Sequence, residues 1–153
     1  EILTDIAAKR KPRGGNFANG VLNSYFLKEN NIPMTIATMS EWDNVEFYIK
    51  EFKLAKWFDV DKIVYSNGKI PGKPAPDIFL IAAGKIGLNP KDCVVFEDAI
   101  AGINAAKAAG IGKIIAVDSI EPIEFYRDID GLSGIITSFD EVDKSMFEIP
   151  SVI

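Results

Sequence analysis

Two acidic residues, Glu97 and Asp98, directly follow the apolar run Val94-Val95-Phe96. Adjacent carboxylates repel each other in a partly desolvated site, and a hard cation such as Mg²⁺ relieves that repulsion and prefers oxygen ligands. A structural alternative is that Asp98 caps the N-terminus of the helix expected to follow. The pair therefore predicts either a magnesium site or a helix cap.

A lysine and a threonine, Lys73 and Thr38, are of types that could bind a phosphoryl group. Lys73 lies in Gly72-Lys73-Pro74-Ala75-Pro76-Asp77, where two prolines stiffen the backbone around it. A compact ammonium on a stiff loop suits a phosphoryl group or metal-bound carboxylates, although an exposed loop lysine is the simpler alternative. Thr38 follows Thr35-Ile36-Ala37 and has a hydroxyl and an N–H to offer a phosphate oxygen, although threonine is also common in strands.

The elements that must position these residues alternate between short apolar runs and helix-period segments. This alternation predicts an α/β fold with a doubly wound, Rossmann-like parallel sheet. We expect strands at residues 34–38, 62–65, 93–96, 114–117 and 135–136. We expect helices at 2–11, 19–30, 77–86 and 99–109, and a further helix capped by Ser40. Ligands bind at the carboxyl ends of such strands, where the sequence places Thr38, Glu97, Asp98 and Asp118.

Taken together, these motifs resemble the haloacid dehalogenase superfamily. They are Thr38 after its apolar run, Lys73 in Gly-Lys-Pro-Ala-Pro-Asp, and Val94-Val95-Phe96-Glu97-Asp98-Ala99 followed by Gly102, Ala105, Ala106, Ala109 and Gly110. The chain is most similar to the β-phosphoglucomutase and sugar-phosphatase group, over about residues 20–136. The resemblance implies that Thr38 and Lys73 are catalytic residues that bind the phosphoryl group. It also implies that Asp98 ligates Mg²⁺, with Glu97 as a second ligand or as its partner.

One part of the family pattern is not found in the sequence. The first family motif, Asp-x-Asp-Gly-Thr/Val after an apolar strand, supplies the nucleophile and the general acid/base, and no such motif precedes Thr38. Two later segments resemble it, Asp59-Val60-Asp61 and Asp128-Ile129-Asp130-Gly131. The first lacks the glycine and falls between Thr38 and Lys73, and the second does not follow an apolar strand, so we interpret both as surface turns. We therefore expect a core domain at 20–153 whose first strand is missing, with 1–19 a remnant of a helical cap and its hinge.

These expectations lead to a function and its alternatives. The resemblance implies a Mg²⁺-dependent phosphatase of small phosphorylated metabolites, with sugar phosphates as the expected class and an aspartyl-phosphate as the intermediate. The near alternative is a phosphomutase of the β-phosphoglucomutase type. A different alternative is a non-catalytic remnant that binds phosphate or a partner, because the chain as given lacks the nucleophile motif and is expected to be inactive. A missing central strand would also expose strand edges and favour self-association.

The amino-acid composition excludes several classes of catalytic site and of partner. The 153 residues contain no histidine, which excludes Ser-His-Asp and Cys-His catalysis and any zinc site built on histidine. The net charge of −5 argues against nucleic acid as a partner, since phosphate backbones require an excess of Lys and Arg. The single cysteine, Cys93, excludes an internal disulfide and favours a cytoplasmic location. No apolar run is long enough to span a membrane.

Overall fold

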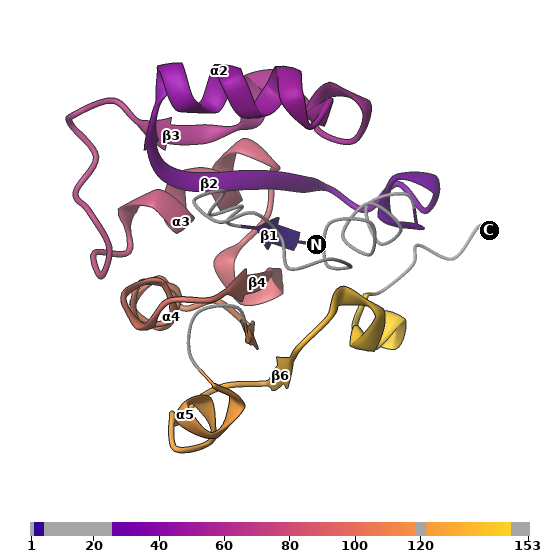
Figure 1. Ribbon diagram of the computed structural model, residues 1–153, viewed down its shortest axis with the longest axis vertical. Helices are drawn as coiled ribbons and strands as arrows, with labels where there is room; N and C mark the ends of the chain where they lie inside the picture. Colours follow the sequence, from indigo (N-terminus) through magenta and orange to yellow (C-terminus); the bar gives the residue numbers. More distant parts are fainter. Residues whose placement is uncertain (1, 5–25, 119–121, 148–153) are drawn as a thin grey trace.

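The computed structural model describes residues 2–4, 26–118 and 122–147 (Figure 1). The hinge predicted at 12–19 and most of the helix predicted at 19–30 lie outside these residues, although residues 26–29 are helical as predicted. The division into a cap remnant at 1–19 and a core at 20–153 stays a prediction.

Among the described residues, parallel strands form one six-stranded sheet in the order β3-β2-β1-β4-β5-β6. The strands are β1 (Ile2–Thr4), β2 (Met34–Glu41), β3 (Val64–Ser66), β4 (Val94–Glu97), β5 (Lys113–Val117) and β6 (Gly134–Ile136). The helices are α2 (Trp42–Glu51), α3 (Asp77–Lys85), α4 (Ile100–Ala108) and α5 (Ile123–Arg127). This is the order of a doubly wound fold, with the switch in winding between β1 and β4, and it confirms the predicted fold class.

The central strand corrects one prediction. Ile2–Thr4 forms β1, which pairs in parallel with β2 and with β4, whereas the sequence predicted a helix there and a sheet without its first strand. The residues Ile2-Leu3-Thr4 are of types that favour strands, and a place between two strands satisfies backbone groups on both edges. The facing edges of β2 and β4, which were predicted to be open, are therefore paired.

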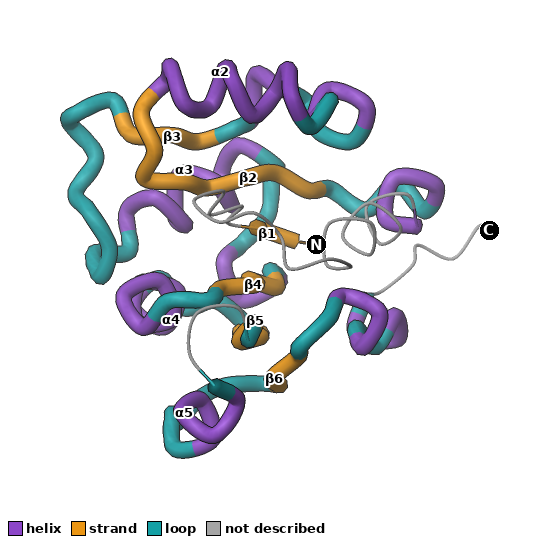
Figure 2. The backbone as a smooth tube through the Cα atoms, in the orientation of Figure 1, coloured by secondary structure: helices purple, strands orange, loops and turns teal. Residues whose placement is uncertain are grey.

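Two apolar layers cover the sheet, because alternate residues of each strand face opposite sides. Figure 2 shows the strands stacked from β3 at the top to β6 at the bottom. One core cluster joins one strand face to α3, α4 and α5, and it includes Ala37, Val95, Phe79, Ile103 and Tyr126. The other joins the opposite face to α2 and to the turns near the C-terminus, and it includes Ile36, Phe96, Val45, Val142 and Phe147.

The element boundaries near the site differ from the sequence prediction in two places. β2 continues past Thr38 to Glu41, and α2 starts at Trp42 without a side-chain cap, so the expected cap at Ser40 is wrong. The backbone N–H of Ser40 instead donates to Thr38 Oγ1 at 3.1 Å, within a register irregularity between Ala37 and Glu41. β3 starts at Val64 because Val60–Lys62 forms a short 3₁₀ turn capped by the side chain of Asp59.

Candidate active site

The candidate site lies at the carboxyl ends of the two strands that flank β1. Thr4, the last residue of β1, is level with Ile36 on β2 and with Phe96 on β4. Thr38 and Glu97 therefore lie two residues and one residue beyond that level, on either side of the point where the winding reverses. The loop from β3 to α3, which carries Lys73, runs along the left of Figure 1, on the side where β2 passes into α2. The topology thus brings the four predicted site residues to one edge of the sheet: Thr38, Lys73, Glu97 and Asp98.

An ion pair between Lys73 and Glu97 forms the buried centre of this site. Lys73 Nζ pairs with Glu97 Oε1, and the two side chains are 10% and 1% exposed. The other carboxylate oxygen, Oε2, accepts the backbone N–H groups of Asp98 and Ala99, each at 3.2 Å. A buried charge is costly unless it is paired and hydrogen-bonded, and Glu97 meets both conditions. This arrangement rules out the alternative of Lys73 as an exposed loop lysine.

An aromatic ring further restrains the lysine. Lys73 Nζ lies 5.0 Å from the centroid of the Phe79 ring, and Phe79 is fully buried on α3. A cation at this distance over an aromatic face is attracted by the ring. The ammonium is therefore held between a carboxylate and a ring, at the end of the loop that the two prolines stiffen.

A glycine on α4 leaves room for the carboxylate of Glu97. A Cβ atom built on Gly102 would lie 2.0–2.2 Å from the carboxylate carbon and both oxygens of Glu97. No such contact is sterically possible, so the position tolerates only glycine as long as Glu97 keeps its place. Gly102 belongs to the family motif, but its residue type did not identify this role in advance, although a glycine inside a helical pattern is a signal of close packing.

Asp98 is half-buried in the short loop between β4 and α4. The N-cap residue of α4 is Ala99, not Asp98 as the structural alternative predicted. The carbonyl oxygen of Asp98 accepts a hydrogen bond from the hydroxyl of Tyr126 at 2.7 Å. Sequence reasoning missed Tyr126, which lies on the separate helix α5, and no local pattern signals this contact.

Thr38 is buried, but its side chain lies away from the ion pair. It shares a face of β2 with Ile36 and lines a small apolar pocket with Val45 and Tyr48 of α2, whereas Glu97 shares a face of β4 with Val95. The structure thus places Thr38 at the same sheet edge as Lys73 and Glu97, but it does not bring their side chains into contact.

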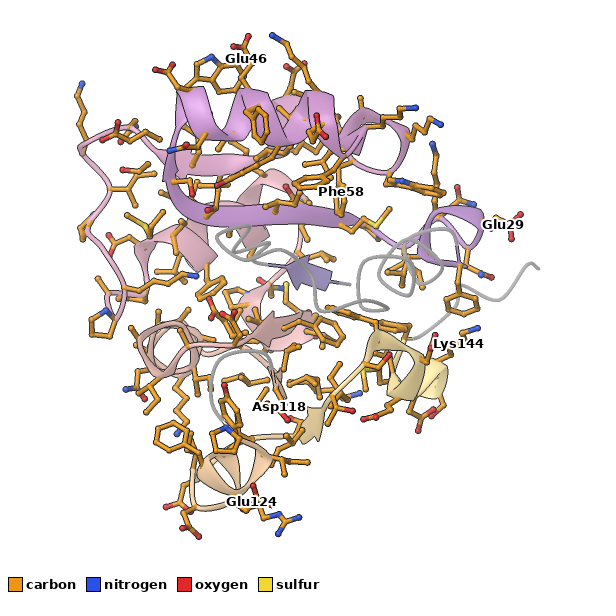
Figure 3. All side chains as sticks on the ribbon, in the orientation of Figure 1. Glu29, Glu46, Phe58, Asp118, Glu124 and Lys144 are labelled. Carbon is orange, nitrogen blue, oxygen red and sulfur yellow. The ribbon has the colours of Figure 1, made fainter. Side chains whose placement is uncertain are left out.

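The two segments that resemble the nucleophile motif are exposed turns, as predicted, and both lie at the opposite edge of the sheet. Asp59 and Asp61 are exposed in the turn that enters β3, where Asp59 caps the turn and pairs with Lys62 at 3.7 Å. Asp128 and Asp130 are exposed in the turn between α5 and β6. Both turns precede their strands and are therefore remote from the carboxyl edge (Figure 3 shows the side chains around both edges).

Within the described ranges, no group of three or more acidic or cysteine side chains lies close enough together to enclose a metal ion. The carboxylates at the candidate site are those of Asp98 and Glu97, and both oxygens of Glu97 accept hydrogen bonds. Mg²⁺ commonly keeps several waters and binds through one or two carboxylates together with substrate phosphate. The residues present therefore suit a metal shared with a phosphorylated substrate. In the same ranges, no helix is long and apolar enough to cross a membrane.

The chain is similar to several known proteins. Residues 19–110 match the haloacid dehalogenase-like hydrolase family. The chain is 41% identical, over 82% of its length, to a protein of Drosophila melanogaster described as a probable pseudouridine-5'-phosphatase. It is also 41% identical, over 56% of its length, to the beta-phosphoglucomutase of Bacillus subtilis.

A solved structure supports the fold. A HAD hydrolase of family IA, variant 3, from Entamoeba histolytica superposes with a TM-score of 0.81 at 39% identity, covering 84% of this chain and 57% of that one. The chain spans 54% of the length of the Drosophila protein and 36% of the length of the Bacillus mutase. The match over residues 19–110 and the placement of Lys73, Glu97 and Asp98 at one sheet edge show that this chain belongs to the haloacid dehalogenase-like hydrolase family.

Proposed function

We propose that the protein is a Mg²⁺-dependent phosphatase of small phosphorylated metabolites, with sugar phosphates as the expected class, acting through an aspartyl-phosphate intermediate. The observation that carries this proposal is the buried pair of Lys73 and Glu97 at the carboxyl edge of the sheet. A fixed ammonium at such an edge stabilises the negative charge of a transferring phosphoryl group without having to reorganise.

The described residues take separate roles in this proposal. Lys73 contacts the phosphoryl group, and Glu97 holds the ammonium in place through Oε1. Thr38 binds a phosphoryl oxygen at the end of β2. Its hydroxyl oxygen accepts the N–H of Ser40, which leaves the O–H as a donor to that phosphoryl oxygen. Glu97, which the sequence suggested as a metal ligand, is assigned here to positioning Lys73.

Asp98 is the residue that would hold the metal. Its side chain belongs to the loop just beyond β4, beside the buried Lys73–Glu97 pair. When bound, Mg²⁺ neutralises charge on phosphoryl oxygens. Asp98 contributes one oxygen ligand, and the backbone around it is fixed by the hydrogen bonds that the neighbouring residues make.

The attacking carboxylate is not assigned to any described residue. In the sequence Asp5 follows Thr4, the last residue of β1, but Asp5-Ile6-Ala7 lacks the second acid of the family motif. A second candidate function, the non-catalytic binding of phosphate, is favoured by this missing motif. It applies to the 153-residue polypeptide as given.

A phosphatase is favoured over a mutase by the extent of similarity. The relative named as a phosphatase matches 82% of this chain, whereas the relative named as a phosphomutase matches 56% at the same identity of 41%. We therefore propose phosphate release to water as the reaction and keep phosphate transfer between sugar positions as the alternative.

The test compares two lysines of one loop in protein expressed from the complete gene. Lys73→Ala is expected to lower Mg²⁺-dependent phosphate release from a panel of sugar phosphates by about 10²–10³-fold, since it removes a preorganised charge. Lys69→Ala, at an exposed position four residues earlier, is the control and is expected to keep the wild-type rate. Equal activity of the two variants would refute the role of Lys73. Conversion of one sugar phosphate into another without net release would favour the mutase.

A further inference from the structure

A fully buried tyrosine outside the family motifs contacts the loop between β4 and α4. Tyr126 lies on α5, beyond residues 19–110 that match the family, and its side chain is 0% exposed. Its hydroxyl donates a hydrogen bond of 2.7 Å to the carbonyl oxygen of Asp98. α5 is a short helix of five residues that follows β5, so a distant part of the chain reaches the loop between β4 and α4.

The loop at Asp98 is restrained from two sides. On one side, the carboxylate of Glu97 accepts the N–H groups of Asp98 and Ala99. On the other, Tyr126 donates to the carbonyl of Asp98. The peptide groups before and after the Asp98 Cα atom are thus both anchored. Two fixed peptide planes also fix the direction of the Cα–Cβ bond between them, so these contacts determine the direction in which the Asp98 side chain leaves the backbone.

We propose that Tyr126 is a positioning residue for the metal site, which orients the carboxylate of Asp98 by holding its backbone carbonyl. This inference rests on the proposed function, in which Asp98 ligates a divalent cation. Partners that orient a metal ligand contribute to affinity although they do not touch the metal. Tyr126 would act in this way through the backbone rather than through a side chain.

A purely structural role is the competing explanation, because Tyr126 also packs in the core with Ile103 and Ala106. Tyr126→Phe separates the two roles, since it keeps the ring and removes only the hydroxyl. Ile114→Val is the matched control: Ile114 is buried in the same core cluster on β5, and the change removes one methyl group without altering a hydrogen bond.

The experiment measures Mn²⁺ affinity by electron paramagnetic resonance, and amide hydrogen exchange at Asp98 and Ala99 by NMR. Asp98→Asn is included to test the metal site itself. For Tyr126→Phe we expect Mn²⁺ binding to weaken by about tenfold and both amides to exchange faster, as found when such supporting partners are removed. Ile114→Val is expected to leave both quantities at wild-type values, even where its thermal stability is as low as that of Tyr126→Phe.

The outcomes separate the two claims. Wild-type Mn²⁺ affinity in Tyr126→Phe, together with lost affinity in Asp98→Asn, would overturn the positioning role and leave the proposed metal site intact. Equal Mn²⁺ affinity in the wild type and in Asp98→Asn would overturn the metal site and, with it, the role given to Tyr126. Weaker binding in Ile114→Val of the same size as in Tyr126→Phe would show that core stability alone sets the affinity.

Discussion

The carboxylate of Glu97 occupies the space in which Gly102, on the neighbouring helix α4, would carry a side chain. A Cβ atom at Gly102 would come within 2.0 Å of the Glu97 carboxylate carbon. Glycine normally weakens a helix interior, so Gly102 lowers the stability of α4. The space that it leaves for the buried Glu97 carboxylate offsets this loss. The spacing of five residues between the two positions thus couples the end of β4 to the packing of α4.

Gly102→Ala is expected to destabilise the fold, because the new methyl group displaces a buried carboxylate from Lys73 and from two backbone N–H groups. Overpacking alone costs about 1–3 kcal/mol. Gly84→Ala is the matched control, since Gly84 lies in α3 with nothing within 4 Å of the added atom. That change is expected to stabilise by about 0.5–1 kcal/mol. Urea unfolding measures both; a stabilised Gly102→Ala would contradict the packing described here.

Breaking the ion pair from one side is expected to be more damaging than removing it altogether. Lys73→Met leaves the buried charge of Glu97 without its cation, and the loss of one partner of a buried pair typically costs about 3–5 kcal/mol. The double variant Lys73→Met with Glu97→Gln removes both charges and is expected to recover much of that loss. The comparison is made by urea unfolding at neutral pH.

An exposed pair provides the control for this comparison. Lys62 and Asp59 lie 3.7 Å apart, with side chains that are 47% and 54% exposed. Lys62→Met is expected to cost less than about 1 kcal/mol, as is usual for surface ion pairs. A loss in Lys73→Met no larger than in Lys62→Met, or a double variant less stable than either single one, would argue against a buried, mutually dependent pair.

The sequence predicted the helices and strands around the site well, because their apolar periodicity is clear. The helix predicted at 77–86 is α3 (Asp77–Lys85), and the strand predicted at 93–96 is β4 (Val94–Glu97). The glycines that follow α3 and α4, Gly87 and Gly110, have positive φ angles of 75° and 72°, as expected for residues that end helices. The edge at which Lys73, Glu97 and Asp98 meet followed from the rule for parallel sheets.

The rest depended on contacts that a single sequence does not encode locally. The segment Ile2–Thr4 is too short to show the alternation of apolar and polar residues that indicates a strand. It forms a strand because β2 and β4 lie on either side of it and pair with it. The Glu97 carboxylate pairs with Lys73 and also accepts the N–H groups of Asp98 and Ala99. The pairing could not be predicted without knowing where Lys73, 24 residues away in the sequence, lies in the fold. The contact of Tyr126 with Asp98 spans 28 residues and involves a backbone carbonyl, which leaves no trace in residue type at that position.

A pH dependence is expected from the turn near the C-terminus. The hydroxyl of Thr137 donates to Glu141 Oε1 at 2.6 Å and its backbone N–H donates to Oε2 at 3.0 Å, and these bonds lower the pKa of Glu141. The folded-state pKa is thus below the unfolded-state value of about 4.3. The resulting stability is fully present above that value and is lost as pH falls through the folded-state pKa.

Thr137→Val removes the larger of the two causes, so its stability should fall less steeply with acid than that of the wild type. The difference is expected to be small, because both side chains are exposed and solvent screens the interaction. Urea unfolding at a series of pH values between about 6 and 3 measures it, spanning the unfolded-state pKa. Identical pH slopes for the two proteins would show that the Thr137 hydroxyl does not stabilise the ionised carboxylate.

The 153-residue polypeptide itself contains no residue to which the nucleophilic attack is assigned. It is expected to show no Mg²⁺-dependent hydrolysis of p-nitrophenyl phosphate, because the reaction requires an attacking carboxylate and the family's Asp-x-Asp-Gly motif does not follow an apolar strand anywhere in this sequence.

Phosphate should nevertheless bind in a manner that depends on Lys73, since the ammonium is held in place by Glu97 and Phe79. Isothermal titration with phosphate and Mg²⁺ tests this binding, with Lys73→Ala as the variant and Lys69→Ala as its control. Turnover that disappears in Asp5→Asn but persists in Asp128→Asn would contradict the expected inactivity and assign the attack to the acid that follows β1.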